Sequence, residues 1–218
     1  MSDTDSFIDE VTEEVKRDKL FAAMRKYGWI AVALVLLIVG GTAWREFRIA
    51  SEERAAQSFG DEILAALDEG DETARIAALE GVEGGATGAE AILQMLIAAE
   101  EGSAGNDAEA VARLQAVADN TEVPSIYRQI ARYKALTRGA EVVSLEDRRS
   151  GFEALAVAGQ PLRLLAEEQL ALIEVEAGDA EAAQARLTRI IEDAEVTAGL
   201  RRRASQLIVA LGGTVPES

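Results

Sequence analysis

An uncharged apolar stretch at residues 28–44, GWIAVALVLLIVGGTAW, constrains the fold of this chain more than any other feature. As a helix that rises 1.5 Å per residue, it would cover about 25 Å, slightly less than the ~30 Å hydrocarbon core of a bilayer. Trp29 and Trp44, near its two ends, are the amphipathic side chains expected at the two headgroup regions. The stretch predicts a single transmembrane helix; a helix buried in a domain core is the alternative.

The residues before this stretch do not resemble a cleaved secretion signal. Such a signal opens with a short basic region, whereas this chain opens with 27 residues of which twelve are charged, seven of them carboxylates. Cleavage after Ala43 remains an alternative, but a permanent signal anchor fits the pattern better. The residues assigned to the anchor are Gly28, Trp29, Gly40, Gly41 and Trp44, and the glycine pair would let a partner helix approach closely.

Basic residues near the stretch predict its orientation. Five precede it and three follow it, and the three are diluted by acidic neighbours: Lys16, Arg17, Lys19, Arg25 and Lys26 before, and Arg45, Arg48 and Arg54 after. Because the more basic flank stays inside, the N-terminus is expected in the cytoplasm and the large C-terminal part on the other side of the membrane.

Composition excludes several classes of function. Residues 45–218 carry 17 basic and 32 acidic side chains, a net charge of −15, which would repel nucleic-acid phosphates. The chain has no cysteine and no histidine, so disulfides, thiolate chemistry and the commonest general base and metal ligand are missing. We therefore predict no enzyme activity, no catalytic, metal or cofactor site, and no small-molecule substrate.

The segments on either side of the anchor are predicted to be helical. Residues 1–27 form an amphipathic segment, capped at Ser6, that either lies at the headgroups or docks on a partner. After Arg45 the helix is expected to continue, through Gly60, to a stop at Gly70 and a new cap at Asp71. We assign residues 28–44 to the anchor, 45–85 to connecting helices, 86–213 to a repeat domain and 214–218 to a tail.

The remainder of the chain shows only helical periodicity. Apolar residues recur at spacings of three and four in groups of about twelve to seventeen residues, and no alternating strand pattern occurs. Thr87 and Ser144 mark predicted helix starts, Pro124 and Pro161 suit first turns, and Gly102 and Gly178 are among the glycines predicted to follow helix ends. The predicted fold class is all-α.

Two stretches repeat each other. AGNDAEAVARLQAVADNTEV and EAGDAEAAQARLTRIIEDAEV place Ala112-Arg113-Leu114 and Ala185-Arg186-Leu187 at a separation of 73 residues, or two units of about 36. We call this separation the repeat offset. It is close to twice the 34-residue tetratricopeptide period and predicts an α-solenoid of stacked helix pairs with a concave groove; chance likeness between alanine-rich helices is the alternative. The residues predicted to pack the repeats are Leu93, Leu114, Tyr127, Ala131, Leu165, Ala166, Leu187, Ala204 and Leu207.

The order of these parts resembles the YfgM-type family of bacterial inner-membrane proteins with a tetratricopeptide-like domain. The resemblance is carried by residues 8–11 (IDEV), 13–18 (EEVKRD) and 25–28 (RKYG), then the apolar stretch, Trp44-Arg45 and the Ala-Gly-Asp turns. It implies a single-pass inner-membrane protein with a periplasmic helical domain. The implied function is that of an interaction scaffold ancillary to the Sec translocon and periplasmic chaperones or their clients. An accessory subunit of another membrane complex, for example a respiratory one, is the alternative.

Overall fold

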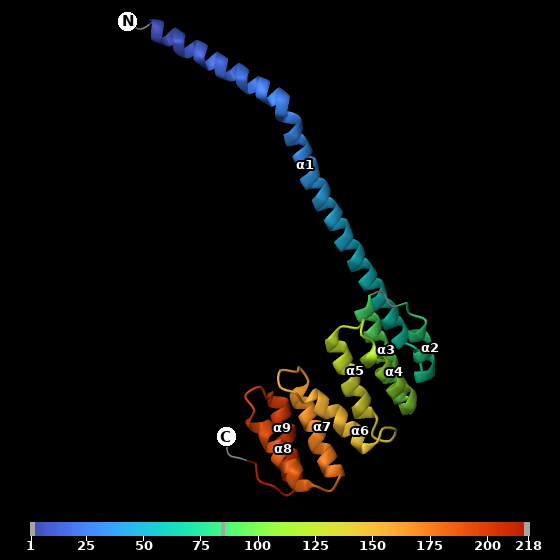
Figure 1. Cartoon of the computed structure of the whole chain (residues 1–218). Helices are drawn as coiled ribbons and strands as arrows, with labels where there is room; N and C mark the ends of the chain where they lie inside the picture. The colour runs from blue at the N-terminus through green and yellow to red at the C-terminus, as the bar shows by residue number, and fades with distance from the viewer. Residues whose placement is uncertain (1–2, 84–85, 216–218) are drawn as a thin grey trace. The chain divides into compact units, whose positions relative to one another are not determined.

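The structure is a computed structural model that describes residues 3–83 and 86–215; within α1, residues 3–23, 27, 28, 31 and 32 are described by their backbone alone. Every regular element in the described part is an α-helix, which confirms the predicted all-α class (Figure 1). Contacts between residues divide the chain into two compact units, residues 1–57 and 58–218.

Helix α1 runs from Asp3 to Leu67. It passes through Gly60 without a break, as predicted, because one glycine costs a helix only about 1 kcal/mol. Its start differs from the prediction, since Ser6 lies inside the helix and not at its N-cap. In the segment after residue 44, local pairs such as Arg48 with Glu52 (3.2 Å) join side chains one turn apart.

Within the residues that the structure describes, no helix combines the length and the apolar character needed to cross a membrane. The transmembrane helix predicted for residues 28–44 is thus not supported. Gly28 lies within α1, among the residues described by their backbone alone.

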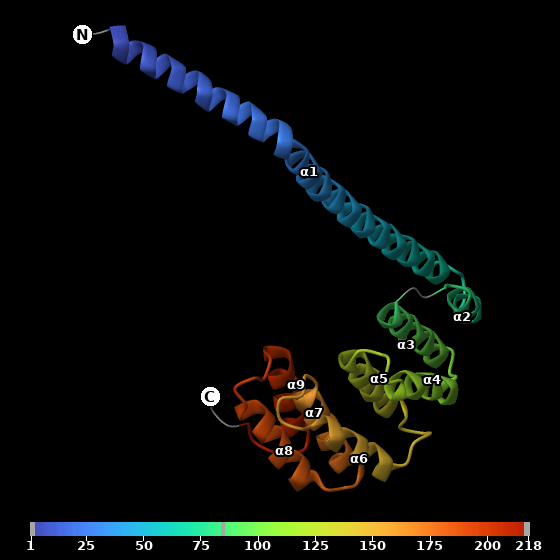
Figure 2. The same ribbon diagram turned by 45° about the horizontal axis from the view of Figure 1, so that its top comes forward.

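Residues 58–218 form a succession of helices in which each packs on the next along the chain, and α3 also contacts α5. Figures 1 and 2 show α3, α4 and α5 side by side and α7, α8 and α9 side by side. The bounds are α2 Glu72–Glu80, α3 Thr87–Ser103, α4 Asp107–Asp119, α5 Ser125–Arg138, α6 Leu145–Leu155, α7 Arg163–Glu176, α8 Ala180–Glu192 and α9 Ala198–Ala210.

The helices repeat with the offset that the sequence predicted. Both ends of α4 precede those of α8 by the repeat offset (107 to 180 and 119 to 192), and the starts of α2 and α5 precede those of α6 and α9 by the same step (72 to 145 and 125 to 198). We call α2–α5 the first four-helix unit and α6–α9 the second. Gly105 and Gly178, which are also related by the repeat offset, both adopt a positive φ (83° and 82°) in the turns before α4 and α8.

Buried side chains follow the same succession. The end of α1 packs with α2 and α3, α3 with α4 and α5, α5 with α6 and α7, and α7 with α8 and α9. Alanines sit where helices cross closely: Ala131, Ala166 and Ala204 are all fully buried. Ala110 and Leu114, like Ala183 and Leu187, are buried and lie four residues apart, which is the spacing of the Ala-x-x-x-Phe pattern in tetratricopeptide units.

Helix caps explain several boundaries and correct others. Asp71 caps α2 by accepting a hydrogen bond from Ala74 N, and Ser144 caps α6 by accepting one from Asp147 N, both as predicted. Thr87 was predicted to cap α3 but is its first residue, because the chain is already helical there. Gly102 does not end α3; it lies inside the helix, next to the guanidinium of Arg138.

Gly151 lies within α6 where α5 approaches closely. A Cβ at this position would come within 2.6 Å of Leu136 Cδ1, and Leu136 is buried. We expect Gly151→Ala to lower the free energy of unfolding by about 1–2 kcal/mol, because the overpacking outweighs the gain in helix propensity. Gly60→Ala in α1 is the matched control: nothing lies within 4 Å of its added Cβ, so it should be neutral or stabilising. Urea unfolding of both variants measures the difference; equal effects would contradict this packing.

Candidate protein-binding surfaces of the helical repeats

A buried ion pair joins α3 to α4 in the first four-helix unit. Arg113 donates to Glu101 Oε1 from Nε (3.0 Å) and from Nη2 (2.6 Å), and donates from Nη1 to Gln94 Oε1 (2.8 Å). The Glu101 side chain is only 8% exposed. The hydrogen bond to this carboxylate raises the pKa of Arg113 above its ordinary value.

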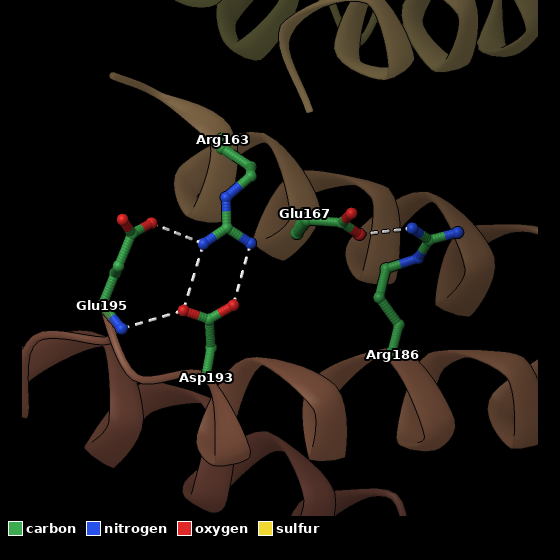
Figure 3. A network of polar contacts seen from close by, with 5 residues as sticks. All are labelled: Arg163, Glu167, Arg186, Asp193 and Glu195. Carbon is green, nitrogen blue, oxygen red and sulfur yellow. Dashed lines mark hydrogen bonds and ion pairs between the residues drawn. The ribbon is translucent and has the colours of Figure 1, made fainter. Parts of the chain in front are cut away.

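The second four-helix unit repeats this ion pair at the repeat offset. Arg186 on α8 donates to Glu174 Oε1 on α7 from Nε (2.9 Å) and Nη2 (2.6 Å). Its third contact is Glu167, which replaces Gln94 (Figure 3). In both units the second glutamate oxygen, Oε2, is buried without a hydrogen-bond partner in the described part of the chain. The arginine is therefore the group that holds each carboxylate, and we interpret both pairs as structural links between the helices of a repeat.

Adjacent carboxylates diverge, as their 100° separation on a helix requires. Glu167 contacts Arg186 on α8, whereas Glu168 accepts two hydrogen bonds from Arg203 on α9, both at 2.7 Å. Glu100 likewise contacts Arg75 at 2.7 Å, while Glu101 holds Arg113. These neighbours in sequence form no converging acid–base pair.

Three consecutive arginines at residues 201–203 form a basic cluster on α9 that is engaged in part with other helices. Arg203 is half exposed but pairs with the buried Glu168, and Arg201 donates from Nε to the carbonyl of Ile191 (3.3 Å). Two of the three arginines thus hold α9 against α7 and α8. Sequence reasoning missed these contacts, because both partners lie on other helices whose packing against α9 the sequence does not specify.

A further network holds the start of α7 against the turn after α8. Arg163 donates to Asp193 through two hydrogen bonds (2.9 and 3.0 Å) and to Glu195 (2.7 Å), and Asp193 also accepts from Glu195 N (2.9 Å), as Figure 3 shows. These hydrogen bonds stabilise the charged carboxylate, and that from Arg163 contributes most to a lowered pKa of Asp193.

This network predicts a pH effect. Because the folded pKa of Asp193 lies below its ordinary 3.8, the stabilisation is present above that value and is lost as the pH falls through the lower folded pKa. We expect carboxyl NMR titration of the intact chain to give a depressed value, and Arg163→Gln to return it towards 3.8. The exposed Arg189→Gln serves as the control. An unchanged Asp193 titration in the Arg163 variant would contradict the assignment.

A hollow of about 430 Å³ lies between α3, α4 and α5. Its lining combines apolar side chains with a polar rim: Met95, Ala98, Ala99, Leu114 and Tyr133, together with Asp107, Lys134, Thr137 and Arg138. Arg138 crosses the rim to Asp107 at 2.8 Å, and Gly102 leaves room for its guanidinium. We call this hollow the α3–α5 groove; its size and its apolar floor suit the side chain of a protein segment.

The structure places the residues predicted to pack the repeats as follows. Leu93, Leu114, Ala131, Ala166, Leu187 and Ala204 are buried. Tyr127 and Leu207 are partly buried against the cores of α3–α5 and α7–α9, and Leu165 is partly buried and lines a cavity beside Arg203. Of the predicted anchor residues, Trp29 and Trp44 are 69% and 68% exposed, and an added Cβ at Gly40 or Gly41 would meet nothing within 4 Å.

Comparison with known proteins relates this helical architecture to a family of repeat proteins. The family model described as "Tetratricopeptide repeat-like domain" matches residues 24–138, that is 115 of the 218 residues. No curated protein and no solved structure matches the chain. The match includes the first four-helix unit, which the second repeats at the repeat offset. Because it covers more than half of the chain, the protein belongs to the tetratricopeptide repeat-like domain family.

Proposed function

We propose that this protein is a non-catalytic protein–protein interaction scaffold whose α3–α5 groove receives a segment of a partner protein. The observation that carries this is the stack of tetratricopeptide-like helix pairs with an apolar-floored groove between α3 and α5. Stacked helix pairs characteristically use extended surfaces for binding other proteins. Most arginines near the repeat interfaces are engaged in internal ion pairs, which favours apolar contact as the main attraction in the groove.

We further propose that residues 28–44 associate the scaffold with a lipid bilayer. Large apolar side chains in this part of α1 are exposed: Trp29, Ile30, Leu34, Val35, Leu36, Leu37, Ile38, Val39 and Trp44. Exposing these side chains to water is unfavourable, and a hydrocarbon environment would remove that cost. The charge bias of the flanks supports a cytoplasmic N-terminus and a periplasmic repeat domain at a bacterial inner membrane.

The partner class that fits this arrangement is a membrane protein complex. The resemblance noted in the sequence favours the Sec translocon with periplasmic chaperones or their clients. An accessory role in another inner-membrane complex, such as a respiratory one, is the competing possibility. Both use the same groove and the same bilayer association, so the identity of the bound protein distinguishes them.

Site-specific photo-crosslinking in cells tests the groove. A photoreactive amino acid at Thr137, which is exposed and lines the groove, should form adducts with a translocon or chaperone component. The same amino acid at Glu109, an exposed residue of α4 absent from the groove lining, is the matched control. Adducts with respiratory subunits at Thr137 would favour the competing role. Equal adducts at both positions, or none at either, would overturn the groove proposal.

The bilayer association has its own test. A reporter enzyme that is active only outside the cytoplasm, fused after Ser218, should be active in cells, and the protein should stay in the membrane fraction after carbonate washing. An inactive reporter would show that the orientation is opposite to the one proposed. Release by carbonate would overturn insertion of residues 28–44 into the bilayer.

A further inference from the structure

A second cavity, of about 200 Å³, lies on another side of α5, against α4 and α6. Its lining is largely polar and consists of Ala118, Ser125, Arg128, Gln129, Arg132, Ala154, Leu155 and Gln160. As far as the chain is described, two arginines line it and no carboxylate does, although Arg132 also contacts the exposed Asp119 at 2.8 Å. The contrast with the surroundings is marked, because residues 45–218 carry a net charge of −15.

Arg128 is the unusual member of this lining. Most other arginines near the repeat interfaces, such as Arg113, Arg163 and Arg186, are paired with carboxylates. In the described part of the chain the Arg128 side chain forms no hydrogen bond and no ion pair, and its Nε is buried without a partner. Gln129 beside it has a buried Oε1 that receives no hydrogen bond there. A donor and an acceptor are thus left unsatisfied at one place, which costs roughly 1–3 kcal/mol per group.

The internal repeat contains an arginine at the equivalent position whose Nε does form a hydrogen bond. Arg201, which follows Arg128 by the repeat offset, donates from Nε to the carbonyl of Ile191. Ile191 corresponds in turn to Ala118, which lines the cavity beside Arg128. The guanidinium at this position is therefore used within the chain in the second four-helix unit and left without a partner in the described part of the first. α9 is followed by no further helix in the described residues, whereas α5 is followed by α6, whose end helps to enclose the cavity.

We propose that this cavity binds an acidic side chain of a partner protein, with its carboxylate on Arg128 and Arg132 and a neighbouring peptide N–H donating to Gln129 Oε1. This rests on the proposed scaffold function but uses a surface distinct from the α3–α5 groove. The planar guanidinium matches a carboxylate through two parallel hydrogen bonds. A peptide supplies the carboxylate acceptor and the N–H donor together, which a nucleic-acid phosphate does not.

The test uses the full chain in detergent micelles, labelled with ¹⁵N in arginine and glutamine side chains. The probe is acetyl-Ala-Glu-Ala-amide, with acetyl-Ala-Gln-Ala-amide and inorganic phosphate as comparisons. We expect the glutamate peptide to shift the Arg128 Nε–Hε and Gln129 amide signals saturably, and the glutamine peptide to leave them unchanged. Arg128→Gln should raise the Kd read at Gln129 roughly tenfold to a hundredfold, with a smaller rise for Arg128→Lys.

Arg189→Gln, which removes the same charge from an exposed position on α8, should leave the Kd unchanged. The proposal is overturned if both peptides shift the signals equally, if Arg128→Gln binds like the parent chain, or if phosphate saturates the site at lower concentrations than the glutamate peptide. If the crosslinks from Thr137 persist but the glutamate peptide does not bind, the proposed role of this cavity is wrong and the proposed scaffold function is retained.

Discussion

Arg186→Ala is expected to lower the free energy of unfolding by about 2–4 kcal/mol. The substitution leaves Glu174, whose side chain is 8% exposed, as a buried carboxylate without its arginine. Its Oε2 has no hydrogen-bond partner in the described part of the chain, so no other contact of that oxygen compensates. Breaking a buried pair on one side costs about 3–5 kcal/mol, and we expect less here because Arg186 is still 19% exposed.

Urea unfolding of the intact chain in detergent measures this effect. Arg189→Ala on the same helix is the matched control, and because this side chain is exposed it should change stability by less than about 0.5 kcal/mol. The double variant Arg186→Met with Glu174→Leu should recover most of the loss, since an apolar pair can replace a buried ion pair. A loss in the double variant as large as in Arg186→Ala would show that the buried charge is not the cause.

The internal repeat supplies an independent check of the same physics. Arg113→Ala should give a comparable loss, because Arg113 holds Glu101 through the same Nε and Nη2 contacts. If only one of the two variants were destabilised, the two units would not share this stabilising contact, despite their common geometry.

Phe152→Ala is expected to cost about 3–5 kcal/mol, because truncation removes the transfer free energy of the ring and leaves a cavity at the junction of the two four-helix units. Phe152 is fully buried between α5, α6 and α7, and its ring meets that of Tyr133 edge to face, with centroids 5.8 Å apart. The same urea measurement applies, with Val157→Ala, 53% exposed just after α6, as the near-neutral control.

The position of this cavity gives the prediction a second outcome. Because the core around Phe152 joins α5 of the first unit to α6 and α7 of the second, its loss should weaken the coupling between units. Leu79, at the N-terminal end of the stack, precedes Phe152 by the repeat offset. We expect Phe152→Ala to give a broader urea transition and a lower apparent m-value than Leu79→Ala. Identical m-values would indicate that the stack unfolds as one block irrespective of this junction.

The arginine pairs show where sequence reasoning stopped. The repeat alignment already contained Arg113 and Arg186, but only as part of a shared Ala-Arg-Leu pattern. Glu101 and Glu174 are also related by the repeat offset, and this second coincidence could have identified the pairs from the sequence. Gly102 was predicted to end a helix because glycine favours such positions; the structure uses it to make room for Arg138, a constraint imposed by a residue on another helix.

The sequence by itself determined the helical class, the internal repeat with its offset, and the order of the helices. These follow from periodicity, caps and turn glycines, which act over a few residues and can be read locally. Only the tertiary structure decided which carboxylate each arginine holds, which hollow forms between α3 and α5, and why the Arg128 side chain has no partner in the described part of the chain. Those depend on how helices far apart in sequence approach one another, and a long charged side chain has several possible partners until packing selects one.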